Sequence, residues 1–170
     1  MQEIVNKVAN SALEVFDLED HFPNEELAEI DISQFLFEGL ILKEKEFRAA
    51  LKTHHWQQYQ NRNIAINVSL DLILPAWATL LVAVCLQPFA KTIIVGTKQE
   101  LLGFIYNQVL SRIDFSVYQN KAVILKGCSK KPVPESAYIF AIQKLQKVAK
   151  SIMYGEACSA VPLFKKHSSV

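Results

Sequence analysis

The sequence predicts an α/β protein whose mainly parallel sheet is built from two duplicated βαβ units, with an N-terminal α+β extension. The first observation behind this prediction is an internal repeat. When the sequence is shifted by 59 residues, Trp56–Gly96 falls on Phe115–Gly155 without a gap, and 11 of the 41 aligned pairs are identical. In the first copy the identical positions are Tyr59, Gln60, Asn61, Pro75, Ala78, Leu86, Gln87, Ala90, Lys91, Ile93 and Gly96.

The second observation is the order of elements within each copy. An apolar strand pattern precedes a helix and a second strand follows it, which is typical of a parallel sheet. A proline, Pro75 or Pro134, stands at the first turn of each helix, where its missing N–H is tolerated. The predicted segments are Arg62–Val68, Ala76–Leu86 and Lys91–Val95 in the first copy, and Lys121–Lys126, Glu135–Val148 and Ser151–Tyr154 in the second.

The third observation is an amphipathic helix, Lys98–Leu110, that links the copies. The helix Ala76–Leu86 differs from it because it is apolar on all sides, which predicts burial on more than one side. That burial has two explanations, namely cover by the N-terminal segment or a homodimer interface, and the sequence leaves both open.

Residues 1–55 form the predicted N-terminal extension. Glu3–Ala12 has the spacing of a short helix, and Lys43–Thr53 that of a surface helix. Leu13–Leu18 and Ala28–Ile32 are predicted strands that suit an antiparallel pair. Phe35–Leu42 is almost wholly apolar, so we expect it to be buried.

Length and composition predict a single domain, with residues 160–170 as a C-terminal tail. The net charge of +1 disfavours a dedicated nucleic-acid-binding protein. The longest apolar run, Leu72–Leu86, contains Pro75 and is too short to span a bilayer. Three cysteines without a secretory signal favour a reducing compartment. We therefore expect a cytoplasmic protein that binds neither nucleic acid nor membranes.

Candidate chemistry follows from the rule that ligands bind beyond the carboxyl ends of parallel strands. That rule selects four loops, which are Ser69–Asp71, Gly96–Thr97, Gly127–Lys131 and Gly155–Ser159. The motifs of dinucleotide and nucleoside-triphosphate sites, GxGxxG and GxxxxGK[ST], do not occur.

Cys128 is the candidate nucleophile, because neighbouring lysines favour the reactive thiolate. Lys130 and Lys131, together with Ser129, are the candidate groups for binding an anionic substrate. The alternative is a half-buried loop cysteine among solvated lysines. Cys85 is expected to pack in the core.

A divalent metal is the candidate cofactor. Cys128 and Cys158, with Glu156 and Asp71, offer the sulfur and oxygen ligands of a mixed site. The chain has no CxxC pair, so packed cysteines are the alternative. His54 and His55 precede a strand and are expected at the surface, away from this site.

Five runs in the sequence resemble a family of bacterial proteins classed only as a domain of unknown function. These runs are Asp17–Asp20, Leu36–Lys45, Lys126–Cys128, Lys131–Pro134, and Ala149–Glu156 with Cys158 and Ser159 behind it. The resemblance implies no catalytic residues. It implies proximity to Suf-type iron–sulfur assembly genes, and hence an accessory role with iron–sulfur assembly proteins as partners.

Three functional hypotheses follow. The first is an accessory protein that handles metal or sulfur through its loop cysteines in iron–sulfur cluster assembly. The second is a cysteine-dependent enzyme acting on a small anionic substrate. The third is a non-catalytic homodimeric interaction module, with the dimer formed through Ala76–Leu86.

Overall fold

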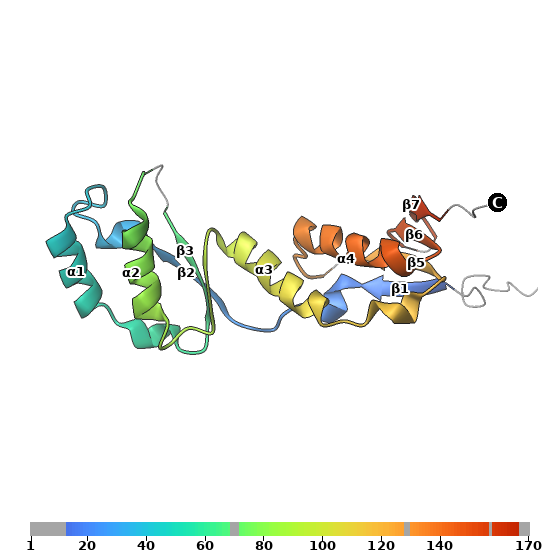
Figure 1. The fold of residues 1–170 in the computed structure, drawn as a ribbon, viewed down its shortest axis with the longest axis horizontal. Helices are drawn as coiled ribbons and strands as arrows, with labels where there is room; N and C mark the ends of the chain where they lie inside the picture. The colour runs from blue at the N-terminus through green and yellow to red at the C-terminus, as the bar shows by residue number, and fades with distance from the viewer. Residues whose placement is uncertain (1–12, 69–71, 128–129, 157, 167–170) are drawn as a thin grey trace, which may run out of the picture. The chain divides into compact units, whose positions relative to one another are not determined.

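The chain forms a mixed α/β structure with two mostly parallel sheets (Figure 1). The computed structural model describes residues 13–68, 72–127, 130–156 and 158–166. The chain divides into two compact units. Unit 1 comprises Met1–Pro23 and Ile105–Val170, and unit 2 comprises Asn24–Phe104. Each unit contains its own sheet, whereas the sequence predicts a single sheet.

Unit 2 has a three-stranded parallel sheet in the order β2-β3-β4. Its strands are β2 (Leu27–Asp31), β3 (Asn63–Asn67) and β4 (Thr92–Val95). Its helices are α1 (Glu44–Thr53) and α2 (Ala76–Leu86), and two short 3₁₀ helices, η2 (Ile32–Phe35) and η3 (Trp56–Tyr59), precede them. The order β3-α2-β4 is the predicted strand–helix–strand unit.

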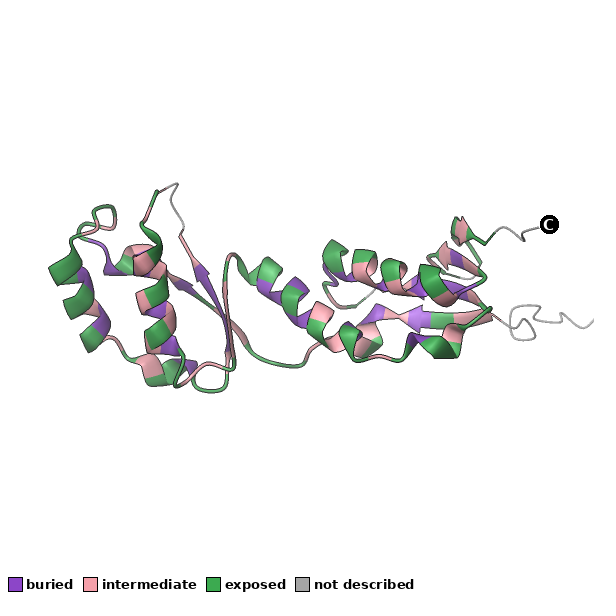
Figure 2. Ribbon diagram, in the orientation of Figure 1, coloured by how far each residue is buried: buried purple, intermediate pink, exposed green. Residues whose placement is uncertain are grey.

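The core of unit 2 lies between its sheet and its two helices. Phe47 and Leu51, four residues apart on α1, are buried there. α2 buries one row of side chains, and exposed residues alternate with buried ones along it (Figure 2). Leu80 and Val84 on its opposite side expose 63% and 67% of their surface. Beside that row, Trp77 and Cys85 are partly buried, and the Trp77 ring meets Phe47 of α1, so the N-terminal segment covers part of α2 as one explanation predicted. The side with Leu80 and Val84 is exposed in this chain taken alone, and the homodimer explanation stays a prediction.

Unit 1 has a four-stranded sheet in the order β1-β5-β6-β7. Its strands are β1 (Leu13–Asp17), β5 (Ala122–Lys126), β6 (Ser151–Tyr154) and β7 (Val161–Lys165). Its helices are α4 (Glu135–Val148) and the 3₁₀ helices η1 (Leu18–His21) and η4 (Phe115–Tyr118). The first three strands are parallel, and β7 runs antiparallel to β6.

Helix α3 (Lys98–Ser111) belongs to unit 2 up to Phe104 and to unit 1 from Ile105 onward. Its Tyr106 is fully buried, and the hydroxyl donates a hydrogen bond of 3.1 Å to the carbonyl oxygen of Leu18. This bond ties α3 to the start of η1.

No helix in the described ranges has both the length and the apolar character needed to cross a membrane.

The predicted helices agree closely with the structure. Both repeat helices have the predicted bounds, and the repeat strands differ by at most one residue at each end. The predicted helix Glu3–Ala12 lies outside the described residues.

The expected antiparallel pair in the N-terminal extension is wrong. β1 pairs in parallel with β5 of unit 1, and β2 pairs in parallel with β3 of unit 2. The physical reason is local, because each strand ends in an aspartate that caps a 3₁₀ helix. Asp17 and Asp31 accept hydrogen bonds from the backbone N–H groups two residues on, so the chain leaves each strand without forming a hairpin.

The expected burial of Phe35–Leu42 is only partly correct. Phe35 is buried, whereas Leu40 and Ile41 expose more than half of their surface. Glu38 and Gly39 have positive φ angles and turn the chain back, so the backbone N–H of Phe37 bonds to the carbonyl of Ile41. The turn projects the two apolar side chains outward.

Candidate functional site

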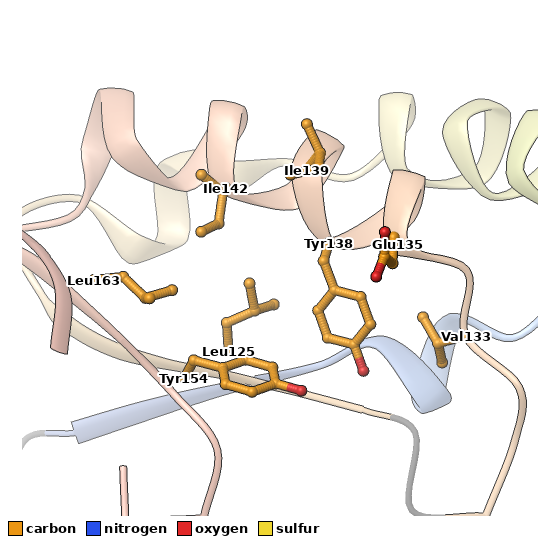
Figure 3. A pocket seen from close by; sticks show the side chains of 8 residues that line it. All are labelled: Leu125, Val133, Glu135, Tyr138, Ile139, Ile142, Tyr154 and Leu163. Carbon is orange, nitrogen blue, oxygen red and sulfur yellow. The ribbon is translucent and has the colours of Figure 1, made fainter. Parts of the chain in front are cut away.

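Strands β1, β5 and β6 are parallel, so their carboxyl ends meet at one edge of the unit 1 sheet. We call it the carboxyl edge. Beside it a pocket of about 550 Å³ opens between α4 and β7, and we call it the α4–β7 pocket (Figure 3). It is lined by Leu125, Val133, Glu135, Tyr138, Ile139, Ile142, Tyr154 and Leu163.

Helical and strand periodicity bring these side chains together. Tyr138 and Ile142 lie one turn apart on α4, so both face the same side of the helix. Tyr154 ends β6, and its ring meets that of Tyr138 edge to face, with centroids 5.7 Å apart. Leu163 of β7 approaches from the opposite wall (Figure 3). The pocket is therefore mainly apolar, with two phenol groups inside it.

Gly127 follows β5 and passes close beneath Tyr138. Its φ angle is 155°, and a Cβ atom added there would lie 2.9 Å from the Tyr138 hydroxyl oxygen. Only glycine allows the backbone this approach and this conformation at low cost. Gly127 thus leaves room for the Tyr138 side chain, which lines the pocket.

A charged cluster lies at the ends of the strands. The Lys126 ammonium is 3.2 Å from the Asp17 carboxylate and 3.9 Å from that of Glu156. The hydrogen bond and charge of Asp17, followed by the charge of Glu156, raise the pKa of Lys126 above its ordinary value. Lys126 therefore stays protonated and joins the ends of β1, β5 and β6.

Both predicted anion-binding lysines contact Glu19, Lys130 through its backbone and Lys131 through its ammonium group. The backbone N–H of Lys130 donates to the Glu19 carboxylate at 2.8 Å. The Lys131 ammonium donates to the Glu19 carbonyl oxygen at 3.2 Å, and it lies 5.2 Å from the centre of the Phe22 ring. These contacts anchor the loop to the residues that follow β1. The anion-binding role stays a prediction.

Cys128, Ser129 and Asp71, three of the predicted site residues, lie outside the described residues. Cys158 is an exposed free thiol in the turn after β6, two residues beyond Glu156. Within the described ranges, no three His, Cys, Asp or Glu side chains are grouped to hold a metal ion. The nucleophile and metal hypotheses therefore stay predictions.

The other residues singled out in the sequence lie in unit 2. Cys85 is half-buried between α1 and α2, and burial raises the pKa of its thiol. His54 and His55 line a separate pocket with Trp56 at the end of α1.

In a comparison with protein families, residues 2–166 match the family described as "Protein of unknown function (DUF2480)". The chain belongs to this family. No curated protein and no solved structure matches this DUF2480 chain.

The α4–β7 pocket of this DUF2480 protein could not be predicted from the sequence. Residues 160–170 were predicted as a tail, whereas the strand β7 within them supplies one wall of the pocket. The apolar run Val161–Phe164 was the available signal. Pro162 obscured it, although proline is tolerated in an edge strand.

Proposed function

We propose that this DUF2480 protein is a non-catalytic accessory protein that binds a small, largely apolar molecule in the α4–β7 pocket. The observation that supports the proposal is the pocket itself, which lies beside the carboxyl ends of parallel strands. That is where open α/β sheets bind their ligands. Its volume of about 550 Å³ is in the usual range of small-molecule sites.

The lining residues suggest the chemistry of the ligand. Leu125, Ile142 and Leu163 provide apolar walls. Tyr138 and Tyr154 bring phenol hydroxyls, which donate or accept hydrogen bonds. A compact apolar body with one hydrogen-bonding group fits this lining.

Filling the pocket tests the proposal. We expect Ile142→Trp to weaken binding of the fluorescent apolar probe anilinonaphthalene sulfonate by about tenfold or more, a loss of about 1.4 kcal/mol. The indole ring would occupy the space that the probe needs. Fluorescence titration of the full chain measures the affinity.

Val117→Trp is the matched control, because Val117 is exposed on η4 of the same unit and does not line the pocket. Its affinity should equal that of the wild type. Equal affinities in all three proteins would contradict binding in the α4–β7 pocket, provided that circular dichroism shows each variant to be folded.

A second candidate function is the handling of metal or sulfur through Cys128 and Cys158 in bacterial, cytoplasmic iron–sulfur cluster assembly. The exposure of the Cys158 thiol beside the carboxyl edge favours it. Glu156, two residues earlier in the sequence, carries a carboxylate that could act as an oxygen ligand. The family resemblance described above supplies the biological context.

Elemental analysis of untagged protein tests this second function. We expect bound metal or persulfide sulfur in the wild type and its loss in Cys128→Ser and Cys158→Ser. Cys85→Ser, in unit 2, should keep it. An empty wild-type protein would rule out metal and sulfur handling. If Cys128 instead alkylates fast near neutral pH, the result would favour the nucleophile hypothesis, with Lys130, Lys131 and Ser129 near the substrate.

We also propose that the two units arose by duplication of one ancestral unit. The bounds of β3 and β5 differ by 59 positions at both ends, as do those of β4 and β6. Asn61 and Asn120, one repeat apart, both have positive φ angles near 60°. Such angles are uncommon outside glycine, so their recurrence supports a shared origin.

A further inference from the structure

We infer that a second copy of this chain docks against β4 of unit 2 and forms a two-fold symmetric dimer. In unit 1, the outer edge of β6 is covered by the antiparallel strand β7. β4 lies 59 positions before β6, and within the described ranges its only strand neighbour is β3. Its other edge therefore presents backbone N–H and C=O groups that another strand can pair with.

The surface beside this edge is apolar. Leu80 and Val84 of α2 are largely exposed, and Val95 at the end of β4 exposes 71% of its surface. From Leu72 to Ala90 the sequence contains no Asp, Glu, Lys or Arg. Exposed apolar side chains on a helix and on the strand beside it mark an interaction site more often than a free face.

The side chains of α2 on the side next to β4 are also small, which favours a helix as the neighbour of α2. Tyr138 and Ile142 of α4 fill the corresponding side in unit 1, where they line the α4–β7 pocket. The positions 59 earlier in α2 are Thr79 and Ala83. Small side chains allow a second helix to approach closely.

A second copy would cover both the open edge of β4 and the small side chains of α2. An antiparallel pair centred on Ile94 places Ile93 of each copy opposite Val95 of the other, and such self-pairing is what a two-fold axis requires. The axis is perpendicular to the joined sheet, so both α2 helices lie on the same face. Strand spacing then sets the helices about 10 Å apart, a distance at which helices pack.

The charges at the ends of β4 suit the same pairing. Lys91 precedes the strand and would lie opposite Thr97 of the second copy. The Lys91 ammonium is already bonded to the Glu25 carboxylate of its own chain. The Glu100 carboxylate of the second copy, which accepts from the Thr97 hydroxyl at 3.0 Å, would be its second acidic neighbour. A basic end of β4 that faces an acidic end favours a second copy over an unrelated apolar segment.

Light scattering on the full chain measures the assembly. We expect the wild type to have twice the chain mass of 19.2 kDa, and Leu80→Arg to have the mass of one chain. Val117→Arg is the matched control, because Val117 lies on η4 of unit 1, is 56% exposed and lines neither the α4–β7 pocket nor the proposed interface. This variant should remain a dimer. A monomeric wild type at all concentrations would overturn the inference.

A cross-link keeps the inference testable if Leu80→Arg fails to fold. With the native cysteines Cys85, Cys128 and Cys158 replaced by serine, Thr79→Cys should form a disulfide-linked dimer on mild oxidation, because the two copies of residue 79 lie near the axis. Val117→Cys in the same background should form none. Equal cross-linking of both variants, or none of Thr79→Cys, would contradict this interface.

Discussion

His54 shows how a single residue of unit 2 depends on its surroundings. Its ring lies against three aromatic rings, with centroid distances of 5.1 Å to Phe35, 4.6 Å to Trp56 and 5.8 Å to Tyr59. Its Nε2 atom is 3.3 Å from the Tyr59 hydroxyl oxygen. Burial, followed by the charge of His55, lowers the pKa of His54 below its ordinary value. We expected His54 at the surface, but it is partly buried, because these rings come together only in the folded chain.

The lowered pKa predicts a loss of stability in acid. Folding favours the neutral imidazole, so the stabilisation is present above the unfolded-state pKa of about 6.5 and is lost as the pH falls through the lower folded-state pKa. We expect His54→Gln to flatten the fall in urea midpoint between about pH 7.5 and pH 5. Tryptophan fluorescence measures the transition, since Trp56 and Trp77 both lie in unit 2.

His21→Gln is the control for this measurement. His21 stacks on Phe16 in unit 1, where the chain has no tryptophan. Its variant should show the same pH dependence of fluorescence as the wild type. If His54→Gln behaved like His21→Gln, His54 would not be the titrating group.

At the scale of elements, strong periodicity made the helices predictable. α1, α2 and α4 each carry an apolar row at helical spacing, and Pro75 and Pro134 mark two of the starts. Edge strands were harder to predict, because one or both of their faces stay in water and the alternation of apolar and polar residues weakens. β7 shows this, since Val161 and Leu163 are about half exposed. Because β7 was not predicted, the pocket wall that it forms was not predicted either.

Strand partners could not be predicted from the local sequence. β1 and β2 are both five residues long, bury the same positions, and end in an aspartate that caps a 3₁₀ helix. Nothing within either segment distinguishes the sheet that it joins. The choice depends on long-range contacts, so an antiparallel pair looked equally reasonable in the sequence.

At the scale of the whole molecule, the two units provide a test of cooperativity. Phe47 is buried in unit 2, and its replacement by alanine should cost about 3–5 kcal/mol. We expect Phe47→Ala to lower the urea midpoint measured by tryptophan fluorescence. Far-ultraviolet circular dichroism, which reports on both units, should show a second transition at higher urea.

Phe16→Ala is the matched variant, because Phe16 is equally buried, but in unit 1. It should leave the fluorescence midpoint unchanged. If both variants shifted that midpoint by the same amount, the chain would unfold as the single domain that the sequence predicts.

The division into units also sets an order of events during synthesis. Unit 2 is one continuous segment, whereas unit 1 is assembled from the segments on either side of it. On the ribosome, β1 emerges early, but its partner β5 follows only after all of unit 2. Unit 2 can fold first, and its compaction shortens the effective loop that β1 and β5 must close. Nascent chains should therefore acquire structure from the middle of the sequence outward.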